Sequence, residues 1–281
     1  MRLLFLGDIV GRSGREGVLR HLPDLKARLK PDFIVVNGEN AAGGFGITEK
    51  IAQELFDAGV DCVTLGNHAW DQKELLGQIG RLPQLVRPIN YPDGTPGRGF
   101  TILPAKNGRH KVMVINAMGR VFMDPLDDPF PPVEKVLNIH RLGGARMGPA
   151  GVDAIIMDMH AEASSEKMIM GHVLDGRVSL VVGTHCHVPT ADLQILNGGT
   201  AYQTDAGMCG DYDTVIGMKK DAAIHKMLRK TPGERYSPGE NDATVSVCGV
   251  FVETDDRTGL ARRAEPVRIG GRLGQSLPAA V

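Results

Sequence analysis

The chain lacks the features of a membrane or disulfide-stabilised protein. No apolar run approaches the roughly 20 residues of a membrane span, and the run at the N-terminus breaks at Gly7-Asp8, too early for a signal peptide. The cysteines are scattered, without a C-x-x-C pair, which favours a reduced cytoplasmic protein over a disulfide framework. They are Cys62, Cys186, Cys209 and Cys248. We therefore expect a cytoplasmic protein without a membrane partner.

The chain also lacks an excess of charge of one sign. Its formal net charge is -1 at pH 7, so we expect no broad basic surface for nucleic-acid phosphates, although a local positive pocket is compatible with this value. There is no internal repeat and no low-complexity segment. With 42% apolar and 23% charged residues the composition is that of a globular protein with a core. Since α/β architectures reach 281 residues as one unit, we expect a single domain over residues 1–281.

What the chain does contain is a buried strand that leads into two histidines. The apolar run 178–182 is followed by Gly183-Thr184, and then by His185 and His187. In an extended chain residues i and i+2 point to the same side, so both imidazoles should face one point, and Cys186 should face away as a small packed side chain. Two neutral imidazoles favour a metal site. The alternative is a surface loop that happens to hold two histidines.

Four further predicted strands end in the same kind of residue. Strands at 3–6, 32–37, 61–65 and 152–159 alternate with helical segments, and in such folds ligands bind at the carboxyl ends of the strands. Simpler explanations are a turn aspartate for Asp8 and a helix-capping role for His68. Asp158 is a candidate partner for an imidazole N–H. The strand ends carry Asp8, Gly38-Glu39-Asn40, Gly66-Asn67-His68 and His160.

Other segments frame these strands. Gly11 to Gly14 lack the P-loop pattern, and we interpret them as turn residues before a helix over 15–29. Further helices are expected over 48–58 and from about residue 71, and a hairpin should join strands at 99–103 and 111–116. The proline-rich residues 119–132 and the helical residues 133–146 could form a cap over about 119–150, or a plain insertion. After residue 255 we expect a hairpin and then a tail over 262–281.

The collected polar residues suit two metal ions. Carboxylate, amide and imidazole donors without thiolate favour iron, manganese or zinc over calcium. They are too many for one tetrahedral ion, but they suit two ions that share a carboxylate. Such a pair binds the attacking and leaving oxygens of a phosphoryl displacement, so phosphoester hydrolysis is the leading chemistry. The set is Asp8, Glu39, Asn40, Asn67, His68, His160, His185 and His187.

In their order along the chain these motifs resemble those of the calcineurin-like metallophosphoesterase superfamily. The first block lacks the usual histidine, since Asp8 is followed by Ile9-Val10. In the second block, where Gly-Asp is usual, Glu39 takes the place of the aspartate and Asn40 follows it. These departures resemble the YmdB-like phosphodiesterase branch. The same branch is indicated by Gly7-Asp-Ile-Val-Gly11, Asn37-Gly-Glu-Asn-Ala41, His160-Ala-Glu-Ala and Thr204-Asp-Ala-Gly-Met208.

The resemblance implies a four-layer αββα sandwich of two mixed sheets and a site with two transition-metal ions, iron first, with manganese or zinc as alternatives. Glu39 would bridge the ions, and His68 would protonate the leaving oxygen. The substrate would be a cyclic nucleotide, with 2',3'-cyclic AMP as the test compound, or another small phosphoester. We also expect a homo-oligomer. One ion would be completed by Asp8, Asn40 and His187, and the other by Asn67, His160 and His185.

Two other functions remain open. A phosphomonoesterase, such as a nucleotidase or protein phosphatase, would share every ligand and differ in the cap. A metal-stabilised regulatory binding protein would keep the ions without turnover. The presence of His68 argues against the second function, because a purely structural site needs no proton donor.

Overall fold

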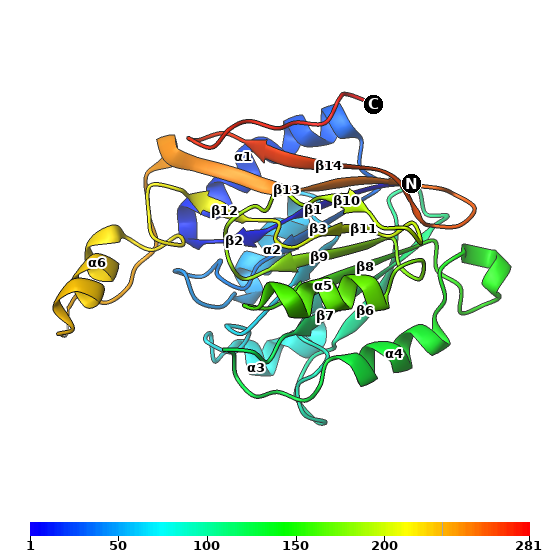
Figure 1. Cartoon of the computed structure of the whole chain (residues 1–281), viewed down its shortest axis with the longest axis horizontal. Coiled ribbons are helices and arrows are strands. Elements are labelled where there is room, and N and C mark those ends of the chain that lie inside the picture. Colours follow the sequence, from blue (N-terminus) through cyan, green and yellow to red (C-terminus); the bar gives the residue numbers. More distant parts are fainter. Residues whose placement is uncertain (232) are drawn as a thin grey trace.

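Two mixed β-sheets pack face to face, and helices cover their outer faces (Figure 1). The structure is a computed structural model that describes residues 1–231 and 233–281. The expected four-layer αββα sandwich is confirmed. In the described part of the chain, no helix combines the length and the apolar character needed to cross a membrane.

The first sheet carries the N-terminal strands. Strands β1, β3, β4 and β5 run parallel, while β13 pairs antiparallel with β1, β12 and β14. The short strand β2 lies parallel to β12 at the edge. In sheet order the strands are β2 (Asp8–Ile9), β12 (Met208–Asp211), β13 (Val245–Thr254), β1 (Arg2–Leu6), β3 (Phe33–Asn37), β4 (Cys62–Thr64) and β5 (Leu85–Val86), with β14 (Ala261–Ile269) beside β13.

The second sheet has a parallel centre and antiparallel edges. Strands β7, β8, β9 and β11 are parallel neighbours, and β6 and β10 pair antiparallel at the two edges. The predicted hairpin of β6 and β7 is confirmed. In sheet order the strands are β10 (Gln194–Ile195), β11 (Ala201–Gln203), β9 (Leu180–Thr184), β8 (Ala154–His160), β7 (Lys111–Met118) and β6 (Phe100–Pro104).

Three apolar clusters hold the layers together. One lies between the sheets and includes Phe5 and Ile156. Another joins the first sheet to the helices that follow its strands, and the third joins the second sheet to its own helices. The helices are α1 (Gly11–Leu29), α2 (Glu49–Asp57) and α3 (Leu75–Gln78) on the first sheet, and α4 (Phe130–Ile139) and α5 (Ser164–Val173) on the second, with single 3₁₀ turns at Ile79–Arg81, Gly144–Met147 and Asp242–Thr244.

The interpretation of the N-terminal glycines as turn residues fits Gly11, which has a φ of 63°, but it was wrong for Gly14. Helix α1 begins at Gly11, four residues earlier than expected, and it includes Gly14 and Gly17. A Cβ on Gly14 would lie 2.2 Å from the carbonyl oxygen of Cys209 in β12, and one on Gly17 would lie 2.5 Å from Val245 in β13. The glycines therefore let the helix approach the sheet closely.

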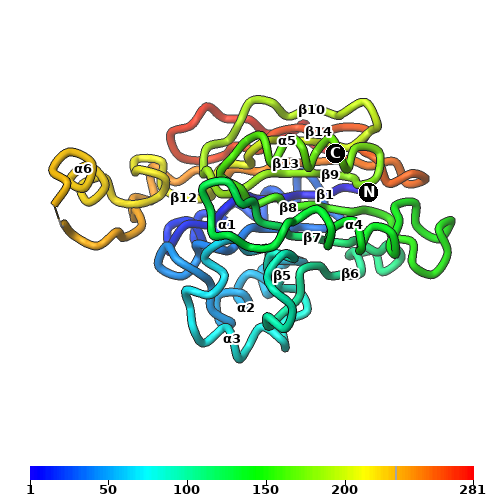
Figure 2. The backbone as a smooth tube through the Cα atoms, turned by 60° about the horizontal axis from the view of Figure 1, so that its bottom comes forward, coloured from blue at the N-terminus to red at the C-terminus, as the bar shows by residue number. Residues whose placement is uncertain are grey.

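Two further elements differ from the sequence prediction. The expected tail contains β14, which pairs with β13 over nearly its whole length. A helix that the sequence did not indicate, α6 (Lys220–Arg229), lies in a segment that projects from the two sheets (Figures 1 and 2). We call residues 212–231 and 233–240 the arm.

Candidate metal centre

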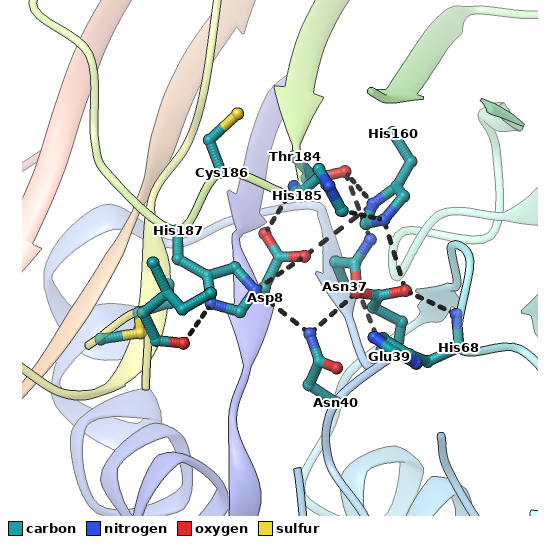
Figure 3. Close-up of polar contacts among 12 residues, drawn as sticks. Asp8, Asn37, Glu39, Asn40, His68, His160, Thr184, His185, Cys186 and His187 are labelled. Carbon is teal, nitrogen blue, oxygen red and sulfur yellow. Dashed lines mark hydrogen bonds and ion pairs between the residues drawn. The ribbon is translucent and has the colours of Figure 1, made fainter. Parts of the chain in front are cut away.

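The predicted site residues gather where strands of both sheets end. Strands β1, β3 and β4 are parallel neighbours, so the residues that follow them lie at one edge. In the facing sheet His160 pairs in register with Thr184, the last residue of β9. Figure 3 shows the resulting cluster, in which side chains from both sheets point toward one another.

The first group of donors contains Glu39, His160 and His185, whose nearest ligand atoms all lie within 4.8 Å of one another. The Nδ1 of His160 lies 2.9 Å from the Thr184 hydroxyl, which itself donates to Asp158 at 2.6 Å. Because the Thr184 hydroxyl donates its hydrogen to Asp158, it can only accept from His160. His160 Nδ1 therefore carries a hydrogen, and Nε2 presents a lone pair.

That lone pair faces other electron-pair donors. The Nε2 of His160 lies 2.8 Å from Asn67 Oδ1, 3.1 Å from His185 Nδ1 and 3.3 Å from Glu39 Oε2. Carbonyl, carboxylate and imidazole atoms in such proximity repel one another unless a proton or a cation lies between them. The first group therefore fits a cation.

The second group contains Asp8, Glu39 and His187, also within 4.8 Å. The Nδ1 of His187 lies 2.8 Å from the carbonyl oxygen of Ile216, so it donates and leaves Nε2 as a lone pair. Asp8 is fully buried, and its Oδ1 has no hydrogen-bond partner. An orphaned carboxylate oxygen in the interior is costly, and a bound cation would satisfy it.

Glu39 belongs to both groups. Its Oε1 accepts from Asn40 Nδ2 at 2.8 Å, and its Oε2 accepts from the His68 backbone N–H at 3.1 Å. Asn40 Nδ2 also lies 3.1 Å from His187 Nε2, so the amide nitrogen faces the second group. Gly66 keeps the space beside Glu39 open, because a Cβ there would lie 2.4 Å from Glu39 Oε2 and 2.3 Å from His160 Nε2.

Burial sets the electrostatics of these groups. Burial raises the pKa of Asp8 well above its usual range, with a further contribution from Asp205, and burial together with Asp8 raises the pKa of Glu39 to about 7. Burial also lowers the pKa of His160, and burial together with His187 lowers that of His185 to about 4. The interior thus disfavours both carboxylate anions and imidazolium cations. A cation bound between these side chains would favour the ionised form of both carboxyl groups.

The two histidines converge for a reason other than the one expected. The residues His185 and His187 have φ of 97° and 65°, so the segment is not extended and the alternation argument was wrong. This left-handed conformation is unfavourable for side chains with a Cβ. Contacts hold it in place: Asp8 accepts from the His185 N–H at 3.3 Å, and Asp205 accepts from the Cys186 N–H at 3.0 Å.

A buried ion pair supports the same segment. Lys167 of α5 is fully buried, and its Nζ donates to Asp205 at 2.7 Å and to the Cys186 sulfur at 3.3 Å. Cys186 therefore does not simply face away, since it contacts Lys167 and also lines the cleft described below. The sequence had not indicated Lys167, because nothing in its local pattern distinguishes it from a solvent-exposed lysine.

Asp158 acts on the site through a hydroxyl rather than directly. It accepts from Thr64 and Thr184 at 2.6 Å each and from Asn37 at 3.1 Å, which links the two sheets. Asp158 was expected to contact an imidazole directly. Instead, one hydrogen bond joins Asp158 to Thr184 and a second joins Thr184 to His160. Three short hydrogen bonds to one buried carboxylate fix the direction of the His160 ring.

His68 lies beside the donor groups but belongs to neither of them. Its Nδ1 is 2.8 Å from Asp71 Oδ2, a partner that the sequence had not indicated. Its ring packs edge-on against Phe45, with centroids 5.1 Å apart. The helix expected from residue 71 begins only at Leu75, so Asp71 lies in the turn that follows His68 and can contact its side chain.

A cleft of about 470 Å³ opens over the cluster. One side carries the polar donors and His68, and the other side is formed by the arm, whose part in the site sequence reasoning missed. None of the described lining residues comes from 119–150, so a cap role for that segment stays a prediction. The lining consists of Glu39, Asn40, Phe45, His68, Glu162, His185, Cys186, His187, Val215, Ile216, Met218, Ala223 and Tyr236.

Comparison with known proteins gives a consistent picture. Residues 4–267 match the model of a family described as YmdB-like protein. The chain is 46% identical over 269 residues to a protein of Bacillus subtilis (strain 168) named 2',3'-cyclic-nucleotide 2'-phosphodiesterase, with 96% of this chain and 97% of that protein covered.

Two solved structures share the fold over nearly their full length. A protein of Thermus thermophilus, described only as hypothetical, has a TM-score of 0.86 and 38% identity, covering 97% of this chain and 100% of that one. A protein described as a novel phosphatase from Mycoplasma pneumoniae has a TM-score of 0.85 and 32% identity, covering 96% of this chain and 93% of that one.

Proposed function

Since the chain belongs to the YmdB-like family of metallophosphoesterases, we propose that it is a metal-dependent phosphodiesterase that hydrolyses nucleoside 2',3'-cyclic phosphates. One observation carries the proposal. Two groups of buried donors share Glu39, and they lie in the same cleft as His68. That arrangement offers two cation sites, one bridging carboxylate and one group that can transfer a proton.

The donor groups support a specific set of ligands. The first ion would be held by Glu39, Asn67, His160 and His185, and the second by Glu39, Asp8, Asn40 and His187. Asn40 would bind through its amide oxygen, which requires the amide plane to turn. Two such ions supply a water of lowered pKa and stabilise negative charge on the phosphoryl oxygens. Imidazole and carboxylate donors without thiolate suit iron, with manganese or zinc as alternatives.

His68 would act on the leaving group. Asp71 accepts from Nδ1–H and stabilises the imidazolium, which can then donate a proton from Nε2. In the reaction a water molecule would release one proton to solvent as its oxygen bonds to phosphorus, and the bond from phosphorus to the ribose 2'-oxygen would break. That oxygen would take a proton from His68, which solvent would then reprotonate. The product is the nucleoside 3'-phosphate, in keeping with the name of the Bacillus subtilis relative.

A substrate panel tests the proposal. The purified chain is loaded in turn with iron, manganese or zinc, its metal content is measured by elemental analysis, and turnover is compared on 2',3'-cyclic AMP, 3',5'-cyclic AMP and 5'-AMP. We expect about two ions per chain and the highest kcat/KM on 2',3'-cyclic AMP. A preference for 5'-AMP would establish a phosphomonoesterase instead. Absence of turnover in every loaded form would favour a regulatory binding protein.

Three broader proposals accompany this function. We propose a single domain over residues 1–281. We also propose a cytoplasmic location, because the described cysteines are all free and three of them are buried among apolar side chains. A homo-oligomer stays a prediction, which sedimentation velocity would test.

A further inference from the structure

A second groove continues from the cleft along the arm. It has a volume of about 960 Å³, and Phe45, Ala223 and Tyr236 line both cavities. A ligand bound at the donor groups can therefore extend past these three residues without leaving the surface. Apart from Phe45, the groove is lined by α6 and by residues 230–231 and 233–236, in the part of the chain that projects at the left of Figure 1.

The groove differs from the cleft in charge. Its charged lining residues are Lys226, Lys230, Arg235 and a single acid, Glu234. Between residues 219 and 236 the chain carries six basic residues and two acidic ones, although the whole protein has a net charge of -1. Basic side chains concentrated in one groove attract phosphate rather than a neutral ligand.

Two aromatic rings stand where the cavities meet. Phe45 packs against His68, and Tyr236 lies under the Lys226 ammonium, which is 5.2 Å from the ring centroid. Aromatic side chains that alternate with basic ones are typical of surfaces that stack a nucleobase between two backbone phosphates. The order along the surface is thus donor groups, aromatic rings and basic groove.

We propose that the basic groove binds a second phosphate, on the 5' side of the nucleoside whose cyclic phosphate is hydrolysed. The substrate is then the 3' end of an oligoribonucleotide that terminates in a 2',3'-cyclic phosphate. Its terminal base contacts Phe45 and Tyr236, and its last internucleotide phosphate contacts Lys226, Lys230 and Arg235. This inference rests on the proposed function, because the donor groups must hold the reacting phosphate.

The test compares substrates with and without that second phosphate. Adenosine 2',3'-cyclic phosphate has none, its 5'-phosphorylated form has a terminal one, and a triadenylate ending in a 2',3'-cyclic phosphate has a linking one. For the metal-loaded chain we expect kcat/KM on the triadenylate to exceed that on the mononucleotide by about 10-fold or more at low salt, and to fall toward it as salt rises. If the 5'-phosphorylated mononucleotide alone shows this gain, the ligand is a free 5'-phosphate, and the oligonucleotide assignment is overturned.

Two triple variants locate the effect. The groove variant carries Lys226→Ala, Lys230→Ala and Arg235→Ala. The control carries Arg109→Ala, Lys135→Ala and Arg229→Ala, which removes the same charge from exposed residues outside the groove. We expect the groove variant to lose the advantage of the triadenylate while its activity on the mononucleotide stays within about two-fold, and the control to keep both. Equal loss on both substrates in the two variants would show a general charge effect and overturn the proposal.

A binding measurement separates this inference from the proposed function. Fluorescence anisotropy follows a labelled triadenylate with a 3'-phosphate, which needs no turnover. We expect its Kd to rise about 10-fold in the groove variant and to stay unchanged in the control. If no substrate is hydrolysed but this difference is found, the proposed function fails and the groove assignment stands. If the Kd values agree, the groove assignment fails. The single variant Arg235→Ala, at an exposed residue, replaces the triple variant should the latter unfold.

Discussion

The donor cluster and the arm share one cleft but are built in opposite ways. Asp8 and His160 are fully buried and Glu39 is 1% exposed, whereas Met227 and Leu228 on α6 are 67% and 73% exposed. The cluster is fixed by strands of two sheets and by hydrogen bonds between them. The arm projects into solvent and meets the cluster at the Ile216 carbonyl, which accepts from His187.

The buried cluster is suited to the chemical step, and the exposed arm is suited to the choice of substrate. A metal pair needs ligands held within a few tenths of an ångström, and a closely packed interior provides that precision. A substrate pocket needs only apolar and basic surface at the right distance, which a projecting segment can supply and vary. The effect of a substitution should therefore fall steadily from the cluster to the arm.

The largest effect is expected for the shared carboxylate. Glu39→Gln removes the charge that both donor groups have in common, so both sites lose affinity. Turnover should fall by about 10⁴-fold or more, since the chemistry depends on the bound ions. Metal content measured by elemental analysis should fall with it, whereas Glu74→Gln, at an exposed residue, should change neither. A Glu39→Gln protein that keeps two ions would contradict the bridging role.

Removal of the proposed proton donor should give the next largest effect. His68→Ala is expected to lower kcat by about 10²–10⁴-fold. Metal content should stay at the wild-type level, because His68 belongs to neither donor group. The matched control is His172→Ala, at an exposed residue of α5. Loss of metal together with activity would instead make His68 a ligand.

A smaller effect is expected for the partner of His68. Asp71→Asn keeps the size of the side chain but removes the charge that stabilises the imidazolium. A charge-assisted hydrogen bond at a partly exposed pair contributes about 1.5 kcal/mol, so kcat should fall by about 10-fold. The informative measurement is kcat of the metal-loaded protein, because Asp71 belongs to neither donor group and metal content should stay at the wild-type level. An unchanged kcat would show that Asp71 does not act on His68.

The smallest effect is expected at the arm. Val215→Ala removes two methyl groups from a wall of the cleft, at a residue that is 41% exposed. Each buried carbon contributes about 0.8 kcal/mol, and the contribution is smaller here because Val215 is partly exposed. The loss of two carbons should therefore weaken substrate binding, with a rise of about two- to five-fold in KM and kcat retained. Val121→Ala makes the same change at 44% exposure, and Val121 does not line the cleft. A fall in kcat of the Val215 variant would show that the arm also positions the reacting group.

The sequence already contained much of the cluster. Strand periodicity placed a glycine and a polar residue at successive strand ends, and the parallel arrangement of those strands made their convergence predictable. The structure brings His185 and His187 into the donor groups, although not through the extended backbone that the sequence suggested, and their role as ligands stays a prediction. Their left-handed backbone depends on the contact of His185 with Asp8, 177 positions away, and on the contact of Cys186 with Asp205, 19 positions away.

Other parts of the site had no local signal. Lys167, Thr184 and Asp71 acquire their roles from the side chains that the fold places beside them. Helix α6 has a modest apolar pattern and few buried residues, so its periodicity did not distinguish it from a polar loop. Helix α1 was predicted too short because glycines usually mark turns. Here Gly14 and Gly17 lie within the helix and let neighbouring strands pack closely against it.

By itself the sequence determined the order of the candidate ligands along the chain, the types of donor atom and the class of fold, because these follow from patterns a few residues long. Only the tertiary structure decided which donors lie in one group, which nitrogen of His160 and of His187 carries the proton, and which segment faces the donors across the cleft. The proton positions depend on contacts 24 and 29 positions apart, whereas the grouping of the donors depends on contacts 121 and 147 positions apart, such as Asn37 with Asp158 and Asn40 with His187. Such contacts exist only once the two sheets have packed together.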